Sequence, residues 1–121
     1  MNLPTPIQAA DLMSDLKGKL EEITSNDTVF LVATEEPLFN GANEFVLAPS
    51  EICGAVLGLI DEEYGWPDSV SADEIKELRD LTPGPRRHPF IERNGRPIAV
   101  GILTDEFEKI LERQAKRRQD D

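Results

Sequence analysis

The chain has 121 residues and a formal net charge of −11, which comes from 24 acidic and 13 basic side chains. Its composition, 39% hydrophobic and 31% charged, is typical of one folded domain rather than a disordered chain, and no apolar run approaches the ~20 residues that span a bilayer. One cysteine and one histidine exclude an internal disulfide and the common zinc clusters, so we expect a cytoplasmic protein with no metal and no cofactor.

The first predicted element is a helix over residues 6–24. Thr5 and Pro6 supply a capping hydroxyl and a proline in the first turn, both typical of a helix start. Apolar residues then recur at alternating spacings of four and three, which places them on one helix face. They are Ala9, Met13, Leu16, Leu20 and Ile23. The turn-forming residues 25–27 end this helix.

Two strands are predicted next. Residues 28–34 are β-branched or apolar on both faces, which indicates a strand that is covered on both sides. Residues 35–43 form a loop, and 44–47 form a second strand, antiparallel to the first. Leu38 and Phe39 lie in the loop, and we expect them to tuck under the sheet; the alternative is exposure to a partner.

The most apolar segment of the chain is a predicted helix over residues 51–64. Residues 52–60 contain no polar side chain, so this helix is either buried on all sides or shared with another subunit. Gly54 and Gly58 lie four residues apart and allow another element to approach closely. We therefore predict a buried central helix and a homodimer.

The last third of the chain begins with a short predicted helix over 72–81, with Ser71 and Glu74 as a capping box, which residues 82–85 end. Asn94-Gly95 then predicts a tight hairpin between strands 89–93 and 97–103, since both positions tolerate positive φ. Pro97 indicates that its strand begins at an edge or at a non-bonded position. A final helix is capped at 104–106, and residues 116–121 are expected to fray.

These elements give the order α-β-β-α-α-β-β-α and predict an α+β fold. It consists of two helix–hairpin–helix halves, 1–64 and 71–118, within a single domain over 1–121. Because hairpins can join all adjacent strands, we expect a mostly antiparallel sheet around the buried central helix.

The charge is unevenly distributed along the chain. Residues 1–81 have 4 basic and 17 acidic side chains, whereas residues 82–121 have 9 and 7. The first part would repel nucleic acid and attract a basic protein. Candidate partner-binding residues are its acids, its tryptophan and the arginines around the hairpin: Glu35, Glu36, Asp61, Glu62, Glu63, Trp66, Asp68, Asp73, Glu74, Glu77, Arg86, Arg87, Arg93 and Arg96.

No catalytic residue is predicted. Cys53 lies in the apolar helix, where a thiol stays protonated, and His88 has neighbouring arginines that disfavour its charged form. The sequence contains no phosphate-binding loop and no zinc-protease motif. One alternative is an enzyme whose site consists of carboxylates. Another is a winged-helix regulator with the arginine-rich hairpin as its wing, although the acids of 72–81 disfavour contact with DNA.

Residues 92–110 carry a family resemblance. Asn94-Gly95, Arg96 and Pro97 are followed by an apolar strand and by a helix with an acidic start and Phe107. This stretch resembles the hairpin and helix of prevent-host-death type antitoxins. The resemblance implies a dimeric protein that neutralises a toxin. We therefore expect a small acidic non-enzymatic interaction protein that inhibits or regulates a basic partner, of the antitoxin, immunity or phage anti-defence type or a DNA mimic.

Overall fold

A computed structural model describes residues 4–50, 68–84 and 88–120 of the chain. The predicted central helix at 51–64, Asp61, Trp66, and Arg86 and Arg87 all lie outside the described residues. The elements are β1 (Thr5–Gln8), α1 (Ala9–Ser14), α2 (Leu16–Asn26), β2 (Phe30–Ala33), β3 (Glu44–Pro49), β4 (Asp68–Ser71), the 3-10 turns η3 (Ala72–Glu74) and η4 (Leu78–Asp80), β5 (Pro89–Arg93), β6 (Arg96–Ile102) and α4 (Thr104–Asp120).

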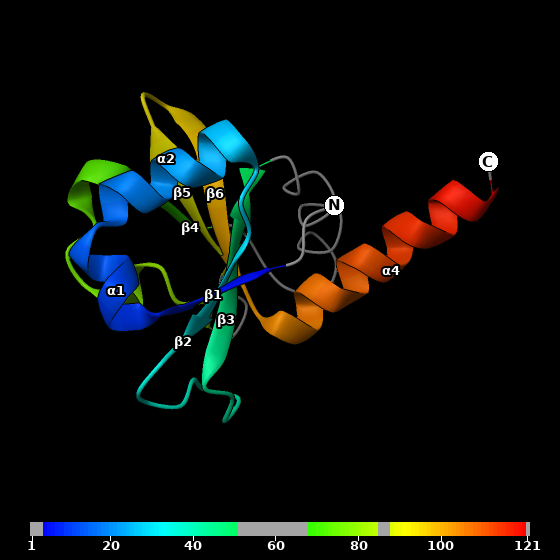
Figure 1. The fold of residues 1–121 in the computed structure, drawn as a ribbon, viewed down its shortest axis with the longest axis horizontal. Coiled ribbons are helices and arrows are strands. Elements are labelled where there is room, and N and C mark those ends of the chain that lie inside the picture. Colours follow the sequence, from blue (N-terminus) through cyan, green and yellow to red (C-terminus); the bar gives the residue numbers. More distant parts are fainter. Residues whose placement is uncertain (1–3, 51–67, 85–87, 121) are drawn as a thin grey trace.

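The six strands form one mixed sheet in the order β1-β2-β3-β6-β5-β4 (Figure 1). The three inner pairs, β2–β3, β3–β6 and β5–β6, are antiparallel. Each edge strand is parallel to its neighbour, β1 to β2 and β4 to β5. The α+β class is therefore confirmed, and the mixed sheet, with three antiparallel pairs and two parallel ones, is compatible with the expected mostly antiparallel arrangement. Strands from both halves of the chain meet at the β3–β6 pair.

The beginning of the chain differs from the predicted helix over 6–24. Thr5–Gln8 is a strand, and the N–H of Thr5 donates to the carbonyl of Val29 at 2.7 Å. The helix that follows is interrupted at Asp15, whose φ of −142° and ψ of 51° are not helical. Parallel pairing with β2 thus overrides the local helix-start pattern of Thr5 and Pro6.

The predicted helix over 72–81 is also wrong. Two 3-10 turns, η3 and η4, occupy this region, and β4 precedes them. The side chain of Ser71 makes no capping hydrogen bond. A capping box does form, but between Glu77 and Asp80 around η4. Each half of the chain therefore contains an added edge strand, and the helix–hairpin–helix pattern of the halves is not found in the described residues.

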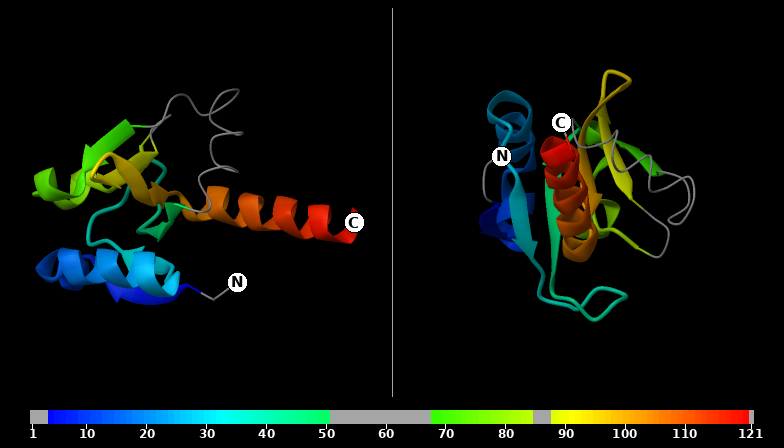
Figure 2. Two further views of the ribbon diagram at one scale, coloured as in Figure 1. Left: turned by 90° about the horizontal axis from the view of Figure 1, so that it is seen from above. Right: turned by 90° about the vertical axis from the view of Figure 1, so that its right-hand side faces the viewer.

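The core lies on both faces of the sheet. Alternate residues of β3 point to opposite sides: Phe45 and Leu47 join the cluster beneath α1 and α2, while Val46 joins the cluster that α4 covers. The start of α4 packs on that second face through Phe107 and Ile110. Figure 2 shows α4 on the side of the sheet away from α1 and α2, with its far end projecting beyond the strands.

The hairpin prediction is confirmed. Asn94 and Gly95 have φ values of 55° and 77°, and they join β5 to β6. Pro97 lies beyond the part of β6 that pairs with β3, which begins at Ala99, so its missing N–H costs no bond on that side. α4 continues to Asp120, which corrects the expected fraying from 116.

The predicted hydroxyl cap of the last helix is not formed. Among the described residues, the buried Thr104 Oγ1 has no hydrogen-bond partner. The first turn is instead closed by the backbone, where the N–H of Phe107 donates to the carbonyl of Leu103 at 2.9 Å.

Candidate functional site

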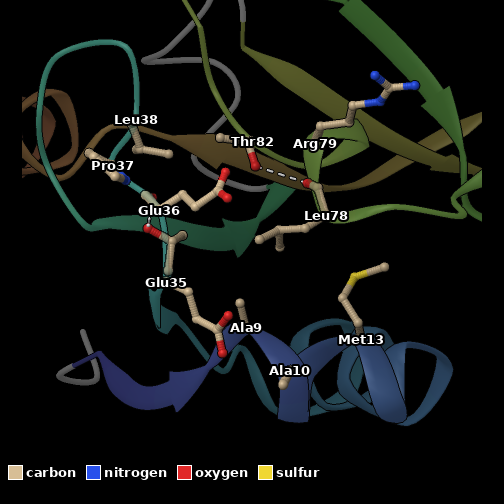
Figure 3. Close-up of a pocket in the computed structure, with 11 residues that line it drawn as sticks. Ala9, Ala10, Met13, Glu35, Glu36, Pro37, Leu38, Leu78, Arg79 and Thr82 are labelled. Atoms are coloured by element: carbon tan, nitrogen blue, oxygen red, sulfur yellow. Dashed lines mark hydrogen bonds between the residues drawn. The ribbon is translucent and has the colours of Figure 1, made fainter.

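A cavity of about 540 Å³ lies between α1, the loop from β2 to β3 and the segment around η4 (Figure 3). Its lining is mostly apolar, with two glutamates on the loop side. The lining residues are Ala9, Ala10, Met13, Thr34, Glu35, Glu36, Pro37, Leu38, Leu78, Arg79 and Thr82. Three segments that are distant in the sequence thus meet at one hollow. Ala9, Leu38 and Leu78, one from each segment, pack in the core cluster beneath α1 and α2.

The loop that carries the two glutamates is held by its own hydrogen bonds. Thr34 donates its hydroxyl to the carbonyl of Glu36 at 2.7 Å, and its N–H to the carbonyl of Asn43 at 2.8 Å. The N–H of Leu38 donates to the carbonyl of Ala42 at 2.7 Å. These bonds close the loop from both ends and hold Glu36 beside the cavity.

Leu38 and Phe39 have different environments at the tip of this loop. Leu38 is half-buried against the core cluster beneath α1, as predicted. Phe39 is 53% exposed, which contradicts the expectation that it tucks under the sheet. The loop therefore presents one aromatic side chain to solvent next to the cavity.

The opposite wall is built from η4 and the residues after it. Asp80 accepts hydrogen bonds from the N–H groups of Lys76 and Glu77, both at 3.1 Å, and so fixes the start of the turn. The Thr82 hydroxyl donates to the carbonyl of Leu78 at 2.9 Å. Leu81 is fully buried in the core, which anchors this wall to the sheet.

The charges at the cavity are unbalanced. Glu35 and Glu36 are exposed, and within the described part of the chain neither forms an ion pair. Arg79 is bound to Glu77 at 2.6 Å. Figure 3 shows Glu36 directed toward Thr82 and Glu35 toward Ala9, whereas Arg79 points away from the cavity. The cavity therefore has an apolar interior and two carboxylates that form no ion pair in the described residues, while Arg79, which also lines it, pairs with Glu77.

The other predicted acids lie apart from these two. Asp73, Glu74 and Glu77 surround a second hollow together with Lys76, Arg79 and Asp80, and Arg79 lines both hollows. Asp68 begins the edge strand β4. Residues 61–63 and 66 are outside the described ranges. The structure thus brings together Glu35 and Glu36 at one cavity and Asp73, Glu74 and Glu77 at another.

The arginines of the hairpin have separate environments. Arg93 forms an ion pair with Glu21 of α2, with 3.1 Å between Nη1 and Oε2. Arg96 is exposed at the hairpin end. Arg93 thus has a partner within the chain, and Arg96 faces solvent.

His88 is buried away from the cavity, at the start of β5. Burial lowers its pKa from the usual 6.5, and the negative charge of Glu106 partly opposes this shift. Glu106 is itself buried and lies 3.7 Å from the ammonium of Lys109. His88 therefore belongs to the packed interior between the sheet and α4.

No group of metal-ligating side chains occurs among residues 4–50, 68–84 and 88–120. In the same ranges, no helix has the length and apolar character needed to cross a membrane. No protein-family model, curated protein or solved structure in the comparisons matches the chain.

Sequence reasoning identified the two glutamates but missed the surface beside them. The helical periodicity predicts Ala9 and Met13 as core residues, and residues 82–85 as the end of a helix. Met13 and Leu78 are instead partly buried against the same core cluster and also line the cavity, and no local pattern signals that these distant segments meet.

Proposed function

We propose that this protein is a small non-enzymatic interaction protein that binds a basic protein and thereby inhibits or regulates it. One observation carries the proposal: Glu35 and Glu36 flank an apolar cavity, and no basic side chain in the described residues neutralises them. Complementary charge on a partner would accelerate encounter and fix its orientation.

The distribution of charge supports a protein partner over nucleic acid. Asp73 and Glu74 are exposed on η3 and have no ion-pair partner in the described ranges, so they add to the negative surface. The winged-helix alternative needed a recognition helix over 72–81, and 3-10 turns stand there instead. Binding to phosphates requires an excess of basic side chains, whereas Lys76 and Arg79 are outnumbered by acids in this region.

The resemblance of residues 92–110 to prevent-host-death type antitoxins gives the proposal a specific form. In that form the basic partner is a toxin that the protein neutralises. The carboxylate-site enzyme stays a prediction that a substrate screen would test.

The partner can be identified by affinity capture from the source cells at low salt, followed by purification and calorimetry with the intact chain. We expect a positively charged protein whose affinity falls as salt rises, because exposed charges are screened. A partner with net negative charge, or binding that is independent of salt, would contradict the proposal.

A matched pair of variants tests the surface. Glu35→Gln/Glu36→Gln removes two charges at the cavity, and Glu108→Gln/Glu112→Gln removes two exposed charges on α4. We expect the first pair to weaken binding about tenfold, since bonds to charged groups contribute about 1.5–3 kcal/mol, and the second to have a much smaller effect. Equal effects would show that only the total charge matters.

A further inference from the structure

The cavity beside Glu35 and Glu36 combines two chemistries. Apolar atoms of Met13, Leu38 and Leu78 line its interior, and the carboxylates stand on the loop side. Its volume of about 540 Å³ is within the range of pockets that hold small organic groups. A long cationic side chain has the same two parts, an apolar stem and a charged end.

We infer that this cavity anchors an arginine side chain of the basic partner, and that Phe39 contacts an apolar residue next to that arginine. The inference rests on the proposed function and specifies how the protein contacts its basic partner. The stem of the arginine would pack on Met13 and Leu78, while the guanidinium would donate hydrogen bonds to Glu35 and Glu36.

The orientation of the two carboxylates favours arginine over lysine. Glu36 is directed toward Thr82 and Glu35 toward Ala9, so the cavity has two separate carboxylate acceptors (Figure 3). A guanidinium has five N–H donors in a planar fork and can bond two acceptors at once, whereas an ammonium is a compact point charge. Arg79 points away from this space, so it does not fill the site from within.

Phe39 indicates that the cation belongs to a protein and not to a free amine. It is the exposed large hydrophobic residue of the described chain, with 53% of its surface accessible. The backbone around it forms a tight turn, in which the N–H of Gly41 donates to the carbonyl of Leu38 at 2.9 Å and the N–H of Leu38 donates to the carbonyl of Ala42 at 2.7 Å. An exposed aromatic next in sequence to a residue that lines a charged pocket is typical of a protein interface.

Titration of the isotope-labelled intact chain with short capped peptides, followed by amide NMR spectra, tests the inference. The first peptide has an arginine next to a leucine. We expect saturable shifts confined to residues 34–42 and 78–82 and to α1. Citrulline in place of arginine keeps the shape and removes the charge, and it should abolish these shifts.

Variants assign the contacts. Glu35→Gln/Glu36→Gln should lower the affinity for the arginine peptide about tenfold, because hydrogen bonds to charged groups are lost. Glu108→Gln/Glu112→Gln should leave this affinity unchanged. Phe39→Ser should lower the affinity for a peptide with leucine beside the arginine, but not for one with serine there. The same spectra show that each variant is folded.

Several results would overturn the inference. The citrulline peptide or a lysine peptide could bind as tightly as the arginine peptide, or free arginine could bind as tightly as that peptide. The chemical-shift changes could also be centred outside the cavity. If the purified basic partner binds while the arginine peptide does not, and Glu35→Gln/Glu36→Gln leaves that partner's affinity unchanged, the anchor is wrong and the proposed function stands. If the captured partner is acidic, the proposed function fails as well.

Discussion

In the described part of the chain, Gly101 is a residue that needs the absence of a side chain. It lies in β6 on the face toward Leu81, and a methyl group built there would overlap the Leu81 carbonyl oxygen. We predict that Gly101→Ala lowers the free energy of unfolding by about 1–3 kcal/mol, the usual cost of overpacking. Urea denaturation measures this, and an unchanged midpoint would contradict the close approach of the Leu81 backbone to the sheet.

We predict that His88 makes the folded chain less stable as the pH falls below 6.5. Burial lowers its pKa below 6.5 in the folded chain, so between that lowered value and 6.5 the unfolded chain binds a proton that the folded chain does not. The free energy of unfolding therefore falls as the pH drops below 6.5, by at most about 1.4 kcal/mol per pH unit from this one group.

The comparison with His88→Gln isolates that contribution, because His88 is the single histidine of the sequence. Unfolding curves from pH 8 to about pH 5.5, just below the unperturbed histidine value, should be steeper in pH for the natural chain than for the variant. Parallel curves would show that His88 titrates normally when folded.

At the scale of elements, the β5–β6 hairpin depends on its turn. Gly95 has a φ of 77°, a conformation that costs other residues about 1–2 kcal/mol. We predict that Gly95→Ala destabilises the chain by about that amount. Arg96→Ala, at the next and exposed position, should change stability by less than about 0.5 kcal/mol. Thermal unfolding of both variants checks the contrast, and equal effects would contradict it.

The ion pair between Glu21 and Arg93 joins α2 to β5 across the sheet. Both side chains are partly exposed, at 62% and 35%. We therefore expect a coupling energy of only about 0.2–1 kcal/mol. A double-mutant cycle with Glu21→Gln and Arg93→Gln measures it, and high salt should reduce it. A coupling that does not respond to salt would require a contact other than this charge pair.

For the whole molecule, the apolar run 52–60 predicts a homodimer, since one small domain has little core in which to bury such a helix. Light scattering should give twice the mass of one chain. The mass of a single chain at micromolar concentration would contradict this prediction. The negative net charge opposes association, so the dimer should be favoured by added salt.

At the same scale, the first two strands of the chain position the site. β1 leads directly into α1, whose Ala9 and Met13 line the cavity, and β1 is held by parallel pairing with β2. The loop after β2 supplies the glutamates. One pair of strands thus positions both the floor and the charged side of the cavity.

The sequence by itself determined the features that depend on near neighbours. The positive φ of Asn94 and Gly95 is a property of those residues, so the hairpin was predicted correctly. The apolar periodicity of α2 likewise indicated a helix. The acidic balance and the exposure of Glu35 and Glu36 follow from composition and from their loop position.

The tertiary structure alone decided the edges of the sheet and the cavity. Thr5–Gln8 and Asp68–Ser71 are strands because β2 and β5 offer parallel partners that lie far away in sequence. The segment 72–81 became two 3-10 turns because Leu81 is buried against the sheet beside Gly101. Long-range strand pairing and packing outweigh weak local propensities. For that reason the cavity, where these segments meet, could not be predicted from local sequence patterns.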